Sequence, residues 1–434
     1  MPGTPPGICM LYYFAKLMMS VALRMFYRHV HVTGFHHIPE KGPVIIIANH
    51  QSSLMDAALI GILLKRKAWF FARGDVFINR PVRQLLRWLH MLPVHGHIRG
   101  KNTRDVNESS FEAGKAILRK GGIIVFFPES TSHVERELYA FRKGVFRLGF
   151  DAAVNGSQPI DIPVVPIGIT YDHPTRANTG VQVHAGEAMA LSDYQQDYAS
   201  NPAQALLRIS RDAWYRVESL MLHIGNPDRF ETAEQRLTID RTDHEYGSHP
   251  WRIQDTHKLQ REQAICRGLL NESEEVYAEK KIAGDAYFGL LKKNEISDEV
   301  VINEKTQPGK TVLLWLLAPF AVAGIVLNAF PFVLGRYVAD KKVFRPDFYS
   351  WIHVVGCALF YCMWVLLITL LTGLMSWWLS LALLVGMVIS GLIARYWLLT
   401  RRAQRARAGW NALAPETRGE LKAKRLAVVK SFRP

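Results

Sequence analysis

Two long apolar runs near the carboxyl end constrain this chain more than any other feature of its sequence. Residues 350–371 and 375–397 contain almost no charge, and only residues 372–374 connect them. At about 1.5 Å per helical residue, each run is long enough to cross a hydrocarbon core of about 30 Å. We therefore predict a transmembrane helical hairpin, which excludes a purely soluble enzyme.

A third apolar stretch, residues 311–335, precedes the hairpin. It is long enough to span a bilayer, but Pro319, Gly324, Asn328 and Pro331 interrupt it. Lysines precede the stretch and Arg336 follows it, so the positive-inside rule places both of its ends in the cytoplasm. We predict a broken or re-entrant element here, within a membrane region that covers residues 311–400.

Positive charge dominates residues 401–434, where ten lysines and arginines stand against two glutamates. Such a run could bind nucleic acid, but attraction to anionic lipid headgroups, worth about 1 kcal/mol per basic residue, explains it more simply after an apolar span. We expect a basic cytoplasmic tail, a membrane partner with anionic lipids, and no nucleic-acid partner. Basic flanks on both sides of the hairpin place the tail, and the part of the chain that precedes the membrane region, on the cytoplasmic face of the cell (inner) membrane.

The amino-terminal residues 1–28 are largely apolar but carry Lys16 and Arg24, and no small-residue cleavage site follows them. This pattern predicts a helix that lies in the membrane interface and not a cleaved signal peptide. The alternative is a soluble amphipathic helix that covers a protein core.

The middle of the chain divides into two regions of different character. Residues 29–191 alternate short runs rich in Val, Ile and Phe with stretches of helical spacing. Continuous runs of this kind suit strands buried on both faces, so we predict an α/β layered domain. Residues 192–310 are polar with helical spacing, and they predict a helical subdomain or linker without evident chemistry.

The most informative local motif is Asn-His-Gln-Ser-Ser-Leu-Met-Asp, residues 49–56, which follows a predicted strand at residues 43–48. A histidine at the carboxyl end of a parallel strand lies at the rim of the sheet, beside a crevice. Imidazole can carry protons near neutral pH, and a carboxylate such as Asp56 can fix its tautomer. The alternative is a helix-capping motif without a catalytic task.

A second motif, Phe-Phe-Pro-Glu-Ser-Thr at residues 126–131, also ends a buried strand. Pro128 ends the strand, and Glu129, Ser130 and Thr131 then present polar groups at the same rim. A helix N-cap is the alternative interpretation. A third strand end, Val-Pro-Ile-Gly at residues 165–168, is apolar and predicts a pocket wall.

Taken in order, these blocks resemble the phospholipid/glycerol acyltransferase superfamily, which includes glycerol-3-phosphate and 1-acylglycerol-3-phosphate acyltransferases. The resemblance covers about residues 32–188 and implies a layered domain of that type with a mostly parallel mixed sheet. It also implies a membrane-bound O-acyltransferase of phospholipid synthesis. Such an enzyme moves a fatty acyl group from an acyl thioester to a hydroxyl of glycerol-3-phosphate or 1-acylglycerol-3-phosphate.

By this resemblance His50 is the general base that takes the proton of the acceptor hydroxyl, and Asp56 orients it. Glu129 then lies near the acceptor glycerol, with Ser130 and Thr131 beside it. The acceptor phosphate would be bound by cationic side chains, because guanidinium and ammonium groups bind phosphate; the candidates are Arg73, Arg99 and Lys143. We expect no metal and no cofactor, since acyl-CoA or acyl-carrier protein serves as the donor substrate.

The sequence departs from the family pattern in its spacing. The family has four residues between the histidine and the aspartate, whereas five separate His50 from Asp56. On a regular helix the two side chains would lie about 240° apart, so their pairing requires a non-helical turn that absorbs the additional residue. Ser130 and Ser132 also stand where members of this family carry Gly and Arg.

Two alternative functions are left open. The chain could acylate another lysophospholipid or a lipid alcohol, or it could be a non-catalytic membrane scaffold that keeps the fold. A nucleotide-binding enzyme is disfavoured, because no glycine-rich phosphate loop opens a helix after a predicted strand.

Overall fold

The computed structural model describes residues 6–95, 103–154, 159–244, 251–254, 256–304, 308–374 and 376–431. The chain divides into two compact units. The sheet unit consists of residues 1–223, 249–259 and 342–354, and the helical unit consists of residues 224–248, 260–341 and 355–434. The sheet unit therefore extends past residue 191, and it includes two segments from much later in the sequence.

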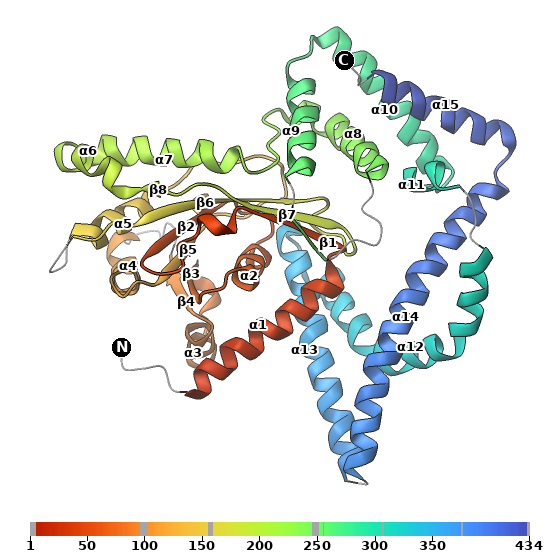
Figure 1. Cartoon of the computed structure of the whole chain (residues 1–434), viewed down its shortest axis with the longest axis horizontal. Coiled ribbons are helices and arrows are strands. Elements are labelled where there is room, and N and C mark those ends of the chain that lie inside the picture. Colours follow the sequence, from red (N-terminus) through yellow and green to blue (C-terminus); the bar gives the residue numbers. More distant parts are fainter. Residues whose placement is uncertain are drawn as a thin grey trace. The chain divides into compact units, whose positions relative to one another are not determined.

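A mixed sheet of nine described strands forms the centre of the sheet unit (Figure 1). The strand order is β4-β3-β5-β2-β6-β7-β1-β9, and β8 pairs with β6. Neighbouring strands are parallel except where β6 meets β7 and β8. The predicted α/β fold with a mostly parallel mixed sheet is thus confirmed. The strands are β1 His29–Thr33, β2 Val44–Ala48, β3 Ala68–Arg73, β4 Met91–Val94, β5 Ile123–Phe126, β6 Pro163–Tyr171, β7 Gly180–Ala185, β8 Met189–Ala190 and β9 Arg252–Ile253.

Helices cover both faces of this sheet. Along β2, Ile46 packs in one core with residues of α1 and α2, whereas Ile45 and Ile47 pack in a second core on the opposite face. Alternate side chains of a strand point to opposite faces, so an unbroken apolar strand needs a core on each side. Figure 1 shows α1 and α2 on one side of the sheet and α7 along the other. The helices of this unit are α1 Pro6–Phe26, α2 Leu54–Leu63, α3 Arg80–Trp88, α4 Thr103–Arg119, α5 Gly144–Val154, α6 Gln195–Ser200 and α7 Pro202–Glu218.

Helix α1 presents two different faces. On the inner face Leu23 joins the core, and Lys16 Nζ donates a hydrogen bond to the Leu64 carbonyl at the end of α2. On the outer face an exposed apolar stripe follows the helical spacing: Met10, Tyr13, Phe14, Leu17 and Val21. The helix therefore covers a core, as the alternative interpretation expected, and it also offers an apolar surface. Its position in a membrane interface stays a prediction.

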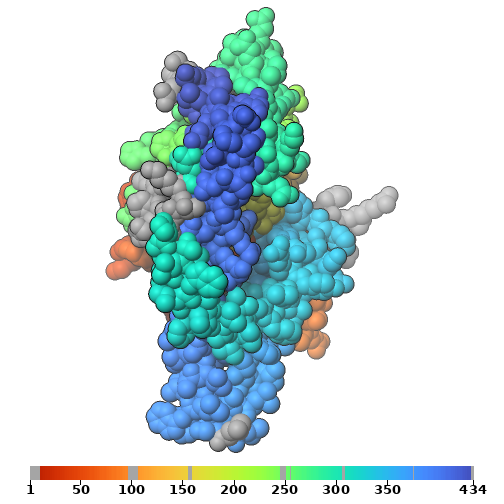
Figure 2. Space-filling view, turned by 90° about the vertical axis from the view of Figure 1, so that its right-hand side faces the viewer, coloured from red at the N-terminus to blue at the C-terminus, as the bar shows by residue number. Residues whose placement is uncertain are grey.

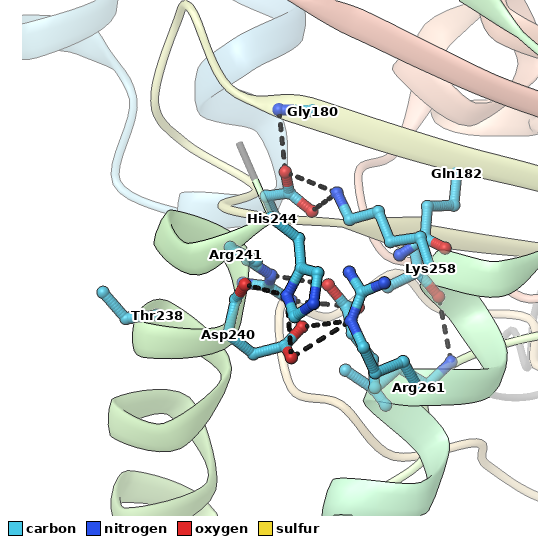
Figure 3. Close-up of polar contacts among 12 residues, drawn as sticks. Gly180, Gln182, Thr238, Asp240, Arg241, His244, Lys258 and Arg261 are labelled. Atoms are coloured by element: carbon cyan, nitrogen blue, oxygen red, sulfur yellow. Dashed lines mark hydrogen bonds and ion pairs between the residues drawn. The ribbon is translucent and has the colours of Figure 1, made fainter. Parts of the chain in front are cut away.

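Residues 251–254 and 256–259 lie at one edge of the sheet. Strand β9 pairs with β1, and the buried Lys258 donates to both carboxylate oxygens of Asp172 at 2.6 and 2.8 Å. The same carboxylate accepts the Gly180 N–H at 3.0 Å (Figure 3). Because a buried ammonium group needs a charged partner, this contact holds the segment against the turn between β6 and β7.

The helical unit has a hydrophobic core of its own. Its helices outside the apolar spans are α8 Phe230–Asp243, α9 His257–Leu270, α10 Glu274–Lys293, α11 Asp298–Ile302 and α15 Pro415–Ser431. Tyr287 and Leu291 of α10 pack in one core with Trp410, Leu421 and Val428. The basic carboxyl-terminal segment is therefore a folded helix, and part of it contributes to this core.

Ion pairs connect the helices around that core. Asp240 of α8 accepts from Arg261 of α9 at 2.8 Å, with His244 on the same carboxylate (Figure 3). Arg425 of α15 binds Asp298 at 2.8 Å and Asp243 at 2.6 Å. Both arginines are partly buried, which makes such pairs stronger than fully exposed ones.

Three described helices are long and apolar enough to cross a membrane: α12 Pro308–Lys342, α13 Pro346–Gly373 and α14 Trp377–Ala412. Helices α13 and α14 match the two runs predicted to form the hairpin. Near their connection, the hydroxyls of Thr372 and Ser380 form a hydrogen bond of 2.7 Å. The chain thus has the helices of a membrane protein.

Residues 311–335 lie within α12, which is one continuous helix despite Pro319 and Pro331, so the expected break is not seen there. Proline lacks the N–H that bonds four residues back, so Pro331 leaves the Leu327 carbonyl without its helical donor. The Trp364 indole N–H donates to that carbonyl at 2.8 Å and takes the place of the missing bond. The helix bends along its length, as Figure 1 shows. Its re-entrant path stays a prediction.

Helices α12 and α14 approach closely through small residues. A Cβ added to Gly324 would lie 2.1 Å from the Ser390 carbonyl oxygen, so only glycine fits at this contact. The buried Asn328 donates to the Met387 carbonyl at 3.2 Å. Figure 2 shows the two helices side by side on one face of the molecule. Small residues and interhelical hydrogen bonds are typical of helices that associate within lipid.

The Asn49 side chain fixes the end of β2, because its amide makes hydrogen bonds that a main-chain peptide group of a neighbouring strand would make. Strand β2 pairs with β6 as far as Ala48 and Ile167. The fully buried Asn49 then accepts the Ile169 N–H at 2.7 Å and donates to the Ile169 carbonyl at 2.9 Å. These two bonds continue the ladder by one step, and they set the point at which the chain leaves the sheet.

We expect Asn49→Ala to lower the stability of the sheet unit by about 2 kcal/mol, because it leaves the buried Ile169 N–H and carbonyl without partners. The measurement is the midpoint of thermal unfolding of the purified protein in detergent. The exposed Gln196→Ala serves as the control and should not shift the midpoint. An equal midpoint for Asn49→Ala and the wild type would show that water replaces the amide without cost.

Candidate active site

Five parallel strands, β2 to β6, bring their carboxyl ends to one edge of the sheet. His50 follows β2, Arg73 ends β3, and Glu129 follows β5. Ligand sites of α/β sheets form along this edge. The structure therefore places predicted site residues from three different strands on the same rim.

His50 and Asp56 meet directly. His50 Nδ1 lies 2.8 Å from Asp56 Oδ2, although five residues separate them in the sequence. Asp56 lies in the first turn of α2, and the residue before this helix, Ser53, has a φ of 47°. That left-handed backbone is the non-helical turn that absorbs the additional residue, and it is unusual for a residue other than glycine.

The Asp56 carboxylate is fully buried and accepts three hydrogen bonds. Its Oδ2 accepts from His50 Nδ1 and from the Ser52 N–H at 2.9 Å, and its Oδ1 accepts from the Tyr171 hydroxyl. A buried carboxylate is stabilised in its charged form when donors surround it. Asp56 therefore acts as an acceptor, and the shared proton lies on His50 Nδ1.

Tyr171 at the end of β6 is a contact that the sequence analysis did not identify. Its ring is buried. Burial, together with the negative charge of Asp56, raises the pKa of Tyr171 well above its usual value. The phenol therefore stays protonated and donates to Asp56 at any physiological pH.

The His50 side chain is partly exposed. The side chain is 18% exposed, and its ring stacks on Phe127 with a centroid separation of 4.2 Å and an interplanar angle of 14°. Within the described residues, His50 Nε2 has no hydrogen-bond partner. Since Nδ1 carries the proton, Nε2 has a free lone pair, as a general base requires.

Glu129 is buried and satisfied within the protein. One carboxylate oxygen accepts the His50 N–H at 2.6 Å, and the other lies 2.8 Å from both His133 Nε2 and the Tyr139 N–H. These contacts fix the main chain of His50 relative to the loop after β5. In this arrangement Glu129 positions His50, and a direct contact with the acceptor stays a prediction.

His133 completes this support. Burial alone would lower the pKa of His133, but its hydrogen bond to Glu129 and the negative charges of Glu129, Glu135 and Glu137 outweigh burial and raise the pKa. The ion pair therefore stabilises the loop fully below about pH 6.5, and this stabilisation is lost as the pH rises through the raised pKa. The main-chain N–H of His133 also donates to the His50 main-chain carbonyl at 3.1 Å.

Ser130 and Thr131 are both exposed at the rim. Ser130 has a φ of 64°, a backbone conformation in which glycine is free of strain and most other residues are not. A glycine at this position, as in members of the family, is therefore compatible with the same loop. Both hydroxyls are accessible to a ligand.

The predicted phosphate-binding cations are less closely gathered. Arg73 is exposed and pairs with Asp75 through Nε at 3.2 Å and through Nη2. Lys143 is exposed just before α5. Arg99 lies outside the described residues. The structure thus places Arg73 at the end of β3, on the rim, and it leaves the role of all three side chains a prediction.

Comparison with known proteins agrees with this architecture. The model of the Acyltransferase family matches residues 29–170. A chloroplast 1-acyl-sn-glycerol-3-phosphate acyltransferase of Arabidopsis thaliana is 26% identical over 157 residues, which cover 36% of this chain and 40% of that protein. The human 1-acyl-sn-glycerol-3-phosphate acyltransferase alpha is 27% identical over 152 residues, which cover 35% of this chain and 49% of that protein. The chain therefore spans about half or less of the length of these relatives.

A solved structure with partial likeness is the 1-acyl-sn-glycerophosphate acyltransferase from Thermotoga maritima. It is 17% identical, and the overlap covers 50% of this chain and 83% of that one with a TM-score of 0.36. A score this low supports no conclusion, so the fold assignment rests on the strand pairing described above. The family match over residues 29–170, with the ordered motifs inside it, shows an acyltransferase domain in this part of the chain, and the relatives support the glycerol-phosphate acyltransferase superfamily.

Proposed function

We propose that this chain transfers a fatty acyl group from an acyl thioester, acyl-CoA or acyl-carrier protein, to a hydroxyl of a glycerol phosphate. The relatives named above are 1-acyl-sn-glycerol-3-phosphate acyltransferases, which favours 1-acylglycerol-3-phosphate as the acceptor over glycerol-3-phosphate. The single observation that carries the proposal is the His50–Asp56 pair at the sheet edge, where His50 is partly exposed and its Nε2 has no partner among the described residues.

The chemistry follows from that pair. The acceptor hydroxyl attacks the thioester carbonyl carbon while His50 Nε2 takes the hydroxyl proton. The tetrahedral intermediate then collapses, the carbon–sulfur bond breaks, and the imidazolium returns the proton to the leaving thiolate. Asp56 stabilises the imidazolium that forms between these steps, and general-base help of this kind is worth about 10²–10⁴-fold in rate.

The deciding experiment supplies the purified protein with labelled acyl-CoA and a panel of acceptors, and it identifies the lipid product. Formation of phosphatidate from 1-acylglycerol-3-phosphate supports the proposal. A product from another lysophospholipid or from a lipid alcohol would revise the acceptor. No product from any acceptor, with acyl-carrier protein also tested as donor, would favour a scaffold role.

We expect His50→Ala to reduce acyl transfer at least about 100-fold, because the variant lacks the proposed base. The measurement is the initial rate with saturating donor and acceptor. His244→Ala is a matched control, because His244 also pairs with an aspartate, Asp240, at 3.3 Å but lies in the helical unit. A His50→Ala rate above a few per cent of the wild-type rate, in a folded variant, would rule out the general-base role.

We expect Asp56→Asn to be nearly as severe. Asparagine keeps the shape of the side chain but lacks the negative charge that stabilises the imidazolium formed when Nε2 takes the proton. Tyr171→Phe is the control, since it removes one donor to Asp56 and keeps the charge, and its effect should stay below tenfold. If the two variants lose activity equally, Asp56 acts through local stability and not through its charge.

We also propose that the sheet unit and the carboxyl-terminal helix lie on the cytoplasmic face of the cell (inner) membrane, beside anionic lipids. Leu291, which precedes α12, and Trp410, which follows the apolar part of α14, share one hydrophobic core. The chain therefore enters and leaves the membrane region on the same side. Since α13 and α14 use two crossings, α12 has to return to the side from which it started.

This topology predicts which residues react with a membrane-impermeant thiol reagent in intact cells. In a variant without native cysteines, Leu374→Cys at the exposed connection between α13 and α14 should react from outside. Lys292→Cys and Glu420→Cys, both exposed in the helical unit, should react only after the membrane is opened. Reaction of Lys292→Cys and Glu420→Cys from opposite faces would show a third crossing.

A further inference from the structure

Segment 342–354 carries an arginine to the loop beside His50. Arg345 Nη2 donates to the Ser132 carbonyl at 3.0 Å, a contact between residues 213 positions apart. The next N–H of that loop, from His133, donates to the His50 carbonyl at 3.1 Å. One peptide group therefore lies between the Arg345 guanidinium and the main chain of His50.

The guanidinium is held in a fixed orientation. Its Nε and Nη2 donate to the Asp347 carboxylate at 3.1 and 2.8 Å, and its centre lies 5.0 Å from the Phe348 ring centroid. Asp347 is buried and also accepts from the Ser132 hydroxyl. The guanidinium is thus ordered by Asp347 and by the Ser132 carbonyl before a ligand binds. Such ordering lowers the entropic cost of binding.

The Nη1 group of this guanidinium has no bond within the described residues and is available to a ligand. Arginine has five N–H donors, and the contacts above use Nε and Nη2. Among the described residues Nη1 has no partner, and the Arg345 side chain is 47% exposed. Two coplanar N–H donors on a half-exposed side chain are therefore left for a ligand, and such a pair can bind phosphate oxygens.

Arg136, another arginine near this loop, offers no such group. Its side chain is buried, and its Nη1 and Nη2 donate to the carbonyls of Tyr171 and Asp172 at 2.8 and 3.1 Å. Arg136 therefore supports the main chain at the end of β6. Arg136 is buried and bonded to main-chain carbonyls, so its role is structural. Arg345 is half-exposed and has donors left, so it can bind a ligand.

We propose that Arg345 binds the phosphate of the acyl acceptor and so makes the enzyme prefer phosphorylated acceptors. This inference rests on the proposed acyl transfer to a glycerol phosphate. The Asp347 carboxylate offsets part of the positive charge, so recognition depends on the two directed Nη1 donors more than on net charge. Arg345 lies just before α13, far from the family motifs in the sequence.

The test compares two acceptors that carry the same short acyl chain, 1-acylglycerol-3-phosphate and 1-monoacylglycerol, which differ by the phosphate. For Arg345→Ala we expect the KM for the phosphorylated acceptor to rise at least tenfold. The KM for acyl-CoA and the rate with monoacylglycerol should stay within twofold of the wild-type values. Arg345→Lys keeps the charge but lacks the paired N–H donors. Its KM for the phosphorylated acceptor should lie between those of the wild type and Arg345→Ala.

Arg208→Ala is the matched control, because Arg208 is also a half-exposed arginine of the sheet unit in an aspartate pair, with Asp197. It should change none of these constants. Equal losses with both acceptors for Arg345→Ala and Arg345→Lys would overturn the proposal and leave Arg345 a support for the loop. An unchanged KM for the phosphorylated acceptor would overturn it as well.

A binding measurement separates this inference from the proposed reaction. Titration calorimetry without donor measures how tightly the short-chain 1-acylglycerol-3-phosphate binds to the wild type and to Arg345→Ala. At least tenfold weaker binding to the variant supports the phosphate contact even if the wild type acylates neither acceptor, an outcome that would refute only the reaction. Equal binding by both proteins, or none by the folded wild type, overturns the phosphate contact.

Discussion

The buried carboxylate of Asp56 is the contact on which the geometry of the site depends. Removing a carboxylate from water costs several kcal/mol, so a fold can bury one only where donors replace the water. Here the donors come from the loop before α2 and from the end of β6: His50, Ser52 and Tyr171. The charge that holds the loop against the sheet is therefore the same charge that assigns the proton to Nδ1 of the imidazole. Local stability and the proposed role of His50 in proton transfer thus depend on the same charge.

The parts of this arrangement that depend on local pattern could be predicted from the sequence. Unbroken apolar runs such as residues 44–48 identify strands covered on both faces, and the polar residues that follow them lie at a common edge because the strands are parallel. The spacing of His50 and Asp56 even required a non-helical turn, which the structure contains at Ser53. The residue that makes this turn could not be named, because the left-handed conformation falls on a serine and no glycine marks it.

The parts that depend on contacts between distant segments could not be predicted. Glu129 follows β5 near the rim, but a carboxylate binds whichever donors the fold brings to it, and these are His133, Tyr139 and the main chain of His50. No periodicity connects Arg345 to a loop 213 residues earlier. The prolines of α12 similarly suggested a break, because the sequence does not show that the Trp364 indole replaces the missing donor.

The folded carboxyl-terminal helix changes how the positive charge of this chain acts. As an open tail, residues 401–434 would attract anionic lipids along their whole length. In the structure Arg425 binds Asp298 and Asp243, and Lys422 binds Glu304 at 2.7 Å, so these cations are largely neutralised within the protein. Arg401 and Arg402 are exposed and directly follow the apolar part of α14. Attraction to headgroups acts only within about a Debye length of the surface, so beside the proposed anionic membrane the cations at the end of α14 would contribute most of it and fix the depth of that helix.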